Sequence, residues 1–273
     1  MTENLAVTPT TPSRTRRIVF TCVGTVLAVL FATNLVNLFA PWTDVNLNHV
    51  ADPSSHRWHH AFEGANDLFA VVLIVALLLK PLARQLLAQH ITVAACLSAI
   101  LVLPFVGPMY LLILASLLLV PATYPRPAKL LQFRSDAGVS RPVLLVAAGA
   151  AALLLARAAQ EMHWQLTGYL GEHATSNAWI GDAAHLVILA AAGLLAATRL
   201  PGYRVLAVTL ATVYAYLGIV AIAQPDQPGS WGIPGGITAL VAAALFVAAT
   251  YAHPPVTKGD LVTAAPVSKA GGR

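Results

Sequence analysis

Histidine and carboxylate side chains, the groups best suited to acid–base chemistry and metal binding, are concentrated in two stretches of this 273-residue chain. The stretches run from His49 to Asp67 and from Glu161 to His185, and they hold seven of the nine histidines. With the neighbouring loops, they hold eight of the eleven acidic residues. Each stretch comes just before, or at the start of, a long apolar segment. This asymmetry predicts a functional site at one end of the molecule.

The first stretch has the spacing of a helix with one ionisable face. Asp52 followed by Pro53 is typical of an N-cap and a first helical residue. The predicted helix starts near residue 53 and continues into the apolar segment 62–80. Four residues spaced i, i+4, i+7 and i+11 share one face of it: His56, His60, Glu63 and Asp67. Asp67 lies deepest, where a carboxylate is costly unless it is paired, hydrogen-bonded or facing water.

The second stretch brings a matching pair to another apolar segment. Asp182 and His185 are three residues apart, so they share a face of the helix predicted over 179–198. His185 lies about two turns inside that helix. Arg157 and Glu161 are four residues apart at the end of the preceding segment, a spacing that favours an ion pair.

These two faces together predict a metal site. The expected ligands are His56, His60, Asp182 and His185, and the expected catalytic base is Glu63 or Asp67. Imidazole and carboxylate ligands suit zinc or iron. The cysteines, Cys22 and Cys96, lie in apolar segments away from this face, so thiolate ligation is not indicated.

Two other interpretations fit the same residues. One is a hydrated polar cavity without metal, in which the histidines and carboxylates couple proton or cation movement to a solute. The other is simple polarity of the loops, which the depth of Asp67 and His185 disfavours. The leading hypothesis is therefore a metal-dependent membrane enzyme with a lipidic or small-molecule substrate. A transporter or solute-binding membrane protein is the alternative.

The segment His56-Arg57-Trp58-His59-His60 has the form HxxHH. It resembles one histidine box of the membrane fatty-acid hydroxylases and desaturases. Those families combine several such boxes on the cytoplasmic side of the membrane. This chain has a single box, and it is predicted on the opposite side, so the resemblance covers five residues and assigns no activity.

Composition excludes a water-soluble protein. Hydrophobic residues make up 58% of the chain and charged residues only 10%, whereas soluble domains carry about 25% charged residues. The net charge of +5 comes from basic residues spread over loops and tails, without a basic stripe that would indicate a nucleic-acid partner. The expected partner is the lipid bilayer.

The apolar segments predict an all-α, polytopic transmembrane helical bundle, because each span must satisfy its own backbone polar groups. Eight spans are expected, at 18–40, 62–80, 86–103, 108–122, 142–160, 179–198, 203–223 and 234–252. The region 86–122 fits either one long helix or a helical hairpin. Pro104 and Pro108 favour a break at its centre, and a re-entrant hairpin there stays open as an alternative.

Eight spans place 14 of the 16 basic residues on one side, which the positive-inside tendency identifies as cytoplasmic. The prediction is a multi-pass protein of the cell membrane with both termini in the cytoplasm. Residues 1–17 and 253–273 are expected to be disordered tails around a membrane domain at 18–252.

The two sets of four spans share a plan. Each begins with a helix, continues through a long loop rich in histidine and acids, and enters a second helix with polar residues near its start. This predicts two four-helix halves related as parallel repeats. All five tryptophans fall in the loops or helix ends on the non-cytoplasmic side, as in an interfacial aromatic belt.

Overall fold

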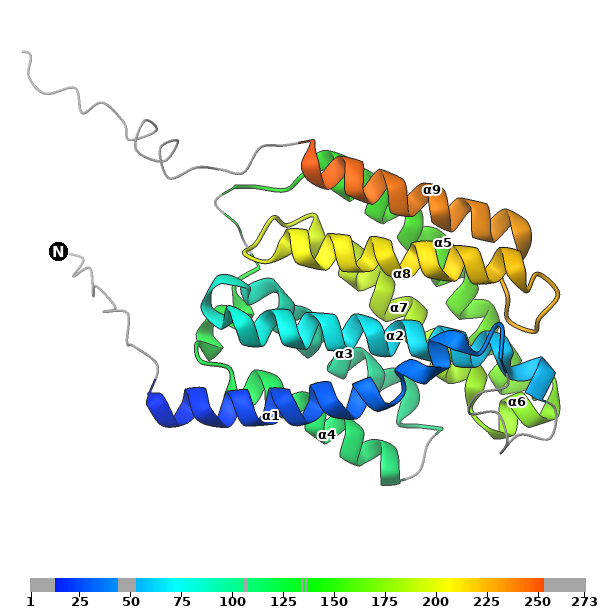
Figure 1. Ribbon diagram of the computed structural model, residues 1–273, viewed down its shortest axis with the longest axis horizontal. Coiled ribbons are helices and arrows are strands. Elements are labelled where there is room, and N and C mark those ends of the chain that lie inside the picture. Colours follow the sequence, from blue (N-terminus) through cyan, green and yellow to red (C-terminus); the bar gives the residue numbers. More distant parts are fainter. Residues whose placement is uncertain (1–12, 44–52, 106–107, 134, 136, 253–273) are drawn as a thin grey trace, which may run out of the picture.

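A computed structural model describes residues 13–43, 53–105, 108–133, 135 and 137–252 (Figure 1). Most of both predicted tails, together with His49 and the N-cap predicted at Asp52, lies outside these described residues. The first helix begins at Arg14, inside the stretch predicted as a tail. The Ser13 side chain caps it by accepting a hydrogen bond from the Arg16 amide at 3.3 Å.

The described residues fold into helices joined by turns. The long helices are α1 (Arg14–Thr33), α2 (Pro53–Leu79), α3 (Gln85–Val102), α4 (Pro108–Thr123), α5 (Arg141–Thr167), α7 (Ala178–Ala196), α8 (Tyr203–Ala223) and α9 (Gly232–Tyr251). The short ones are η1 (Leu35–Phe39), η2 (Pro81–Ala83), η3 (Pro127–Leu131) and α6 (Gly171–Thr175). No strand occurs in the described part of the chain.

Among the described residues, seven helices are long and apolar enough to cross a membrane, and α4 is a shorter apolar helix. The predicted all-α polytopic bundle of about eight spans is thus confirmed. The region 86–122 forms two helices that break between Val102 and Pro108, as the prolines predicted. The α4 helix runs back beside α3 and also packs against α1.

The ends of several helices differ from the predicted spans. The first span does not stay α-helical to residue 40 but finishes as the 3-10 helix η1. The α2 and α5 helices have 27 residues each, which is about 40 Å against a hydrocarbon core of about 30 Å. Their extra turns carry the histidine and acidic residues, so the polar clusters are built on helix ends that project beyond the apolar core.

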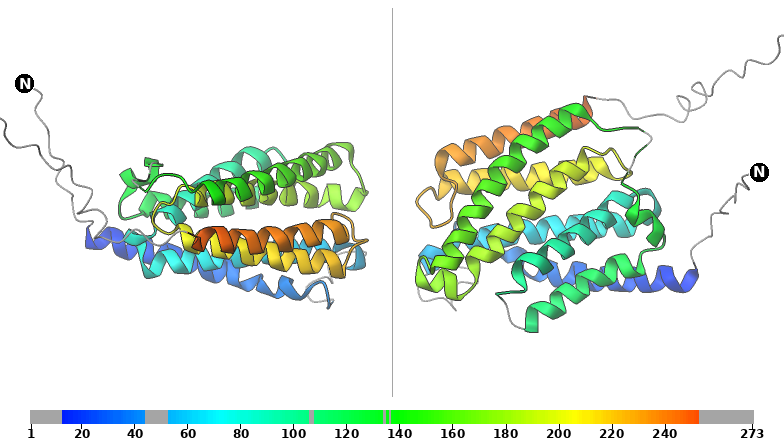
Figure 2. Two further views of the ribbon diagram at one scale, coloured as in Figure 1. Left: turned by 90° about the horizontal axis from the view of Figure 1, so that it is seen from above. Right: turned by 180° about the vertical axis from the view of Figure 1, so that it is seen from behind.

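The eight long helices form two layers of four (Figure 2). One layer has the order α1, α2, α8, α9, and the other has the order α4, α3, α7, α5. The layers also contact each other at their edges, where α1 packs on α4 and α5 packs on α9.

This arrangement has an internal two-fold plan. Within α1–α4 the packed pairs are α1·α2, α3·α4 and α1·α4, and within α5–α9 they are α5·α7, α8·α9 and α5·α9. The main contacts between the halves, α2·α8 and α3·α7, also exchange under the same correspondence. The predicted division into two four-helix halves therefore agrees with the helix packing, and both halves start from the same end of the bundle, as parallel repeats do.

Leucines fill the centre of the bundle between the two layers. Five of them, from α2, α7 and α8, are at most 1% exposed: Leu73, Leu77, Leu189, Leu210 and Leu217. By contrast, outward-facing side chains such as Leu145 and Ile100 are 75% and 70% exposed, as expected of a surface that contacts lipid. The centre between α2, α7 and α8 is therefore packed with apolar side chains.

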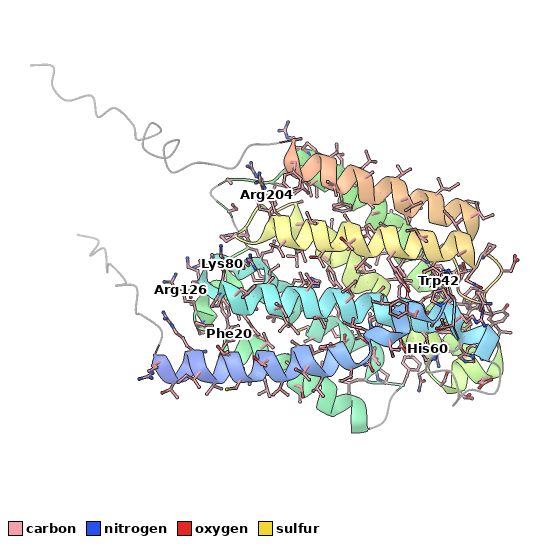
Figure 3. All side chains as sticks on the ribbon, viewed as in Figure 1. Phe20, Trp42, His60, Lys80, Arg126 and Arg204 are labelled. Carbon is pink, nitrogen blue, oxygen red and sulfur yellow. The ribbon has the colours of Figure 1, made fainter. Side chains whose placement is uncertain are left out.

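The two ends of the bundle carry different kinds of side chain (Figure 3). Lys80, Arg126 and Arg204 lie at the end where α1 begins and α9 finishes. His60 and Trp42 lie at the other end. These three basic residues therefore lie at the end opposite His60, in agreement with the predicted asymmetry.

Candidate functional site

A buried histidine–aspartate pair joins the two halves at the histidine-rich end. His59 Nδ1 of α2 lies 2.6 Å from Asp182 Oδ2 of α7. Their side chains are only 5% and 4% exposed. At this distance a hydrogen bond joins the two groups; when the carboxylate accepts it from Nδ1–H, Nε2 is left to act as an acceptor. No described residue hydrogen-bonds to that Nε2.

Aromatic rings surround His59 on the sides that Asp182 does not cover. The His173 ring, from α6, lies 4.8 Å from the His59 ring and stacks on His56 with a centroid distance of 4.2 Å. Trp179 meets His59 edge-on at 4.8 Å and stacks on His173 at 5.1 Å. The imidazoles of His56 and His59 on α2 and of His173 on α6 therefore form one buried cluster beside Trp179.

A second histidine–carboxylate pair is more accessible. His60 Nδ1 lies 3.3 Å from Glu63 Oε2, and the Glu63 side chain is 49% exposed. Glu63 also lies within electrostatic range of His59 and His185. The two predicted faces, one on α2 and one on α7, thus do come together at the same end of the bundle.

His185 and Asp67 lie deeper than these pairs. His185 packs beside Phe62, with ring centroids 6.1 Å apart, and its Nδ1 has no hydrogen-bond partner among the described residues. The Asp67 carboxylate forms a side-chain hydrogen bond with Asn34 at the end of α1. Asp67 is therefore stabilised by an amide and belongs to the edge of the site.

An ion pair flanks the cluster on α5. Arg157 Nε donates to Glu161 Oε1 at 3.0 Å, and Glu161 is 1% exposed. The Glu161 Oε2 atom has no hydrogen-bond partner among the described residues. The Arg157 guanidinium also lies 4.8 Å from the centroid of Trp164. The predicted pair is confirmed, and it places a buried carboxylate within electrostatic range of Asp182.

The α8–α9 loop closes over the site. Arg157 Nη2 donates to the Gly229 carbonyl at 2.6 Å. Gly229 has a φ of +86°, and a Cβ there would lie 2.9 Å from Trp58 and 3.2 Å from Trp179. The loop fits between these two tryptophans only because residue 229 has no side chain.

The tryptophans are divided between two roles. Trp42 is 53% exposed, as an interfacial residue would be. Trp58 and Trp179 are 1% and 0% exposed, so the predicted interfacial belt is wrong for these two. They form part of the wall around the histidines.

A cavity of about 270 Å³ opens beside Arg157, between α5, α8 and α9. Its lining is mostly apolar and includes Leu153, which is 59% exposed, so the cavity reaches the lipid-facing surface. Tyr214 lines it from α8, and its buried hydroxyl has no hydrogen-bond partner among the described residues. The cavity thus connects the lipid surface with the ion pair next to the histidine cluster.

The predicted metal ligands do not converge on a point. In the part of the chain that is described, no three or more histidine, cysteine, aspartate or glutamate side chains are arranged to hold a metal ion. His56 stacks face to face on His173, and Asp182 is engaged by His59. Ring nitrogens bind metals in the plane of the ring, so stacked imidazoles cannot both point at one ion. Metal ligation by His56, His60, Asp182 and His185 stays a prediction without support from this geometry.

Three residues that the structure brings to the candidate site are outside the predicted ligand set: His59, His173 and Glu161. The helix-face spacing selects His56 and His60 instead of His59, and Glu161 is predicted only as the partner of Arg157. For His59 a signal existed, because Trp58, Ala61, Phe62 and Ala65 surround it with apolar and small residues typical of a packed helix face. For His173 the sequence held no such signal, since its position depends on the turn formed by α6.

Comparisons with protein-family models, with curated proteins and with solved structures find no match. The interpretation of the site therefore rests on its own geometry.

Proposed function

We propose that this multi-pass membrane protein is an enzyme whose site performs acid–base chemistry at the end of the bundle where α2 and α7 begin. His59 is the proton-transfer residue, and Asp182 orients it. The 2.6 Å contact between them carries the proposal. A carboxylate that holds Nδ1–H stabilises the imidazolium formed when Nε2 accepts a proton, which is the arrangement that general-base histidines require.

The exposed carboxylate gives this site a route to solvent. Glu63 is half exposed and its Oε2 lies 3.3 Å from His60 Nδ1, so it is placed to exchange protons between the buried cluster and water. Asp67, hydrogen-bonded to Asn34, has a supporting electrostatic role. Of the two residues predicted as catalytic, Glu63 is therefore proposed to transfer protons, and Asp67 is proposed only to support the site electrostatically.

A lipidic or amphipathic substrate fits the surroundings best. The cavity beside Arg157 is open toward lipid, and Arg157 supplies a positive charge at one end of it. The buried Tyr214 hydroxyl supplies a hydrogen-bond donor further in. An apolar molecule with an oxygen-bearing head would satisfy both groups.

The experiment compares product formation by variants in lipid nanodiscs. Purified protein is incubated with a membrane lipid extract, and changes in the lipids are followed by mass spectrometry. We expect a product with the native protein, its loss in His59→Gln and its strong reduction in Asp182→Asn. His163→Gln, at an exposed histidine of α5, is the matched control and should behave as the native protein. Undiminished product formation by His59→Gln would refute the proposal.

Proton-coupled transport is the second candidate, because the His59–Asp182 pair crosses the interface between the two halves. A rocking motion of the halves would make and break that contact. The leucine-filled middle of the bundle favours a one-sided site instead. Solute uptake into proteoliposomes that depends on a pH gradient and on Asp182 would favour transport.

Metal-assisted catalysis is a third form of the proposal. The observation in its favour is that His59 Nε2 and His185 Nδ1 are buried without hydrogen-bond partners among the described residues. Elemental analysis of purified protein decides it. One equivalent of zinc or iron that disappears in His185→Ala would support it, and metal-free active protein would exclude it.

We also place the protein in the cell membrane with both termini cytoplasmic. The segregation of Lys80, Arg126 and Arg204 from the histidine-rich end supports this orientation. The proposed site then faces the outside of the cell.

A further inference from the structure

A second cavity lies at the basic end of the bundle, at the opposite end from the His59–Asp182 pair. It has a volume of about 350 Å³ and is formed where α1 begins and where α2 and α4 finish. Arg17 and Phe20 of α1 line one side of it, and Lys80, Leu82 and Pro125 line the others. Since helix ends mark the boundary of the apolar core, this cavity lies at the level of lipid headgroups.

The walls of this cavity are fixed by contacts between distant segments. Arg16 donates to the carbonyl oxygens of Tyr124 and Ala122, both at 2.9 Å. The Tyr124 hydroxyl donates to the Pro81 carbonyl at 2.7 Å. Phe20 packs edge-on against the Tyr124 ring at 5.8 Å. Burial raises the pKa of Tyr124 to about 12, so its hydroxyl stays protonated as a donor at physiological pH. The cavity is therefore pre-formed.

The cations at its rim lie apart from the carboxylates that the structure describes. Arg17 and Lys80 form no ion pair with any described residue. The described carboxylates lie on the other end of the molecule, on α2, α5, α6, α7 and the α8–α9 loop. Two cations beside a pre-formed hollow, without an anionic partner among the described residues, favour binding of a phosphate group.

We propose that this cavity binds the phosphate headgroup of an anionic phospholipid. Arg17 and Lys80 contact the phosphate, and Phe20 and Leu82 pack against the first methylenes of the acyl chains. Basic pockets between transmembrane helices at the membrane surface recognise anionic lipids in this way. This lipid site is independent of the acid–base site, because the two lie at opposite ends of the bundle and lipid binding is measured without any reaction.

The test measures lipid binding to the purified full-length protein in detergent by native mass spectrometry. Phosphatidylglycerol is titrated against phosphatidylcholine, and the variant is the double substitution Arg17→Gln and Lys80→Gln. Each surface cation contributes roughly a fivefold gain in anionic lipid affinity, so the double variant should lose about 25-fold. Binding of phosphatidylcholine should be unchanged.

A charge-matched control separates a site from general attraction. The double substitution Lys129→Gln and Arg141→Gln also removes two positive charges from this end of the bundle, but neither residue lines the cavity. This control should lose less than about twofold. An equal loss in both double variants, or native protein that prefers phosphatidylglycerol no more than phosphatidylcholine, would overturn the proposal.

A second arm distinguishes a lipid from free phosphate. Inorganic phosphate is added to the phosphatidylglycerol complex at millimolar concentration. We expect no displacement, because free phosphate lacks the chains that contact Phe20 and Leu82. Full displacement would assign the cavity to a soluble phosphate ligand and overturn the lipid proposal. Thermal unfolding of each variant confirms that it is folded, which the exposure of Arg17 and Lys80 predicts.

Discussion

Asp182 holds His59 at 2.6 Å although 123 positions separate them in the sequence. The contact joins α2 of the first half to α7 of the second, at the end where both helices begin. Because both side chains are buried, a group that lost its partner could not form a replacement hydrogen bond with bulk water. It therefore couples the chemistry of the site to the packing of the two halves.

Replacing Asp182 by alanine should destabilise the protein strongly. Removing one member of a buried charged pair typically costs about 3–5 kcal/mol, because the remaining group loses its compensation. The free energy of unfolding can be measured by titration with sodium dodecyl sulfate in mixed micelles. Asp226→Ala, in the α8–α9 loop, is the matched control and should change stability by no more than about 0.5 kcal/mol. Similar unfolding curves for both variants would contradict a structural role for the pair.

The sequence predicts the helices of this protein well because membrane spans are set by local properties. A run of about 20 apolar residues has to be helical and has to cross, whatever its neighbours are. The pair Arg157–Glu161 was predicted for a similar reason, since residues four apart on a helix meet regardless of the rest of the fold. The break between α3 and α4 follows from the local effect of Pro104 and Pro108.

The partner of His59 could not be predicted in the same way. Which face of α2 meets α7 depends on how both helices rotate within the bundle, and that is decided by packing of residues far apart in sequence. The spacing of His56, His60, Glu63 and Asp67 predicts a shared face but not which of its neighbours meets α7. His59, one turn before Glu63 on nearly the same side of α2, is buried against Asp182, while Glu63 is half exposed.

The Arg157–Glu161 pair should show strong coupling in a double-mutant cycle. Arg157→Met alone leaves the Glu161 carboxylate buried without its cation, and should cost about 3–5 kcal/mol. The double variant Arg157→Met with Glu161→Gln has no uncompensated charge, and should be more stable than Arg157→Met. Unfolding titrations of the native protein, both single variants and the double variant give the coupling energy. Additive effects would show that the ion pair contributes nothing of its own.

Gly229→Ala should disturb the loop that covers the site. The residue has a φ of +86°, and its added Cβ would lie 2.9 Å from Trp58. Strain of this kind costs of order 1–3 kcal/mol, and the loop must move to relieve it. The result should be a loss of stability with a shift in tryptophan fluorescence as Trp58 and Trp179 become more accessible.

Gly149→Ala provides the matched control for that substitution. Gly149 lies within α5, and a Cβ there would meet nothing within 4 Å. The change should stabilise the helix by roughly 0.5–1 kcal/mol and leave the fluorescence unchanged. If Gly229→Ala behaved like Gly149→Ala, the tight fit of the loop against the tryptophans would be wrong.

The orientation of the bundle makes a prediction that can be tested in whole cells. In a background with Cys22→Ala and Cys96→Ala, a single cysteine is introduced at Asp226 or at Lys129. These positions lie at opposite ends of the bundle, in the α8–α9 loop and in η3. The segregation of basic residues predicts that only the cysteine at position 226 reacts with a membrane-impermeant maleimide in intact cells, and that both react after lysis. Labelling of position 129 alone in intact cells would invert the topology and place the His59–Asp182 site on the cytoplasmic side, where its substrate would have to be an intracellular one.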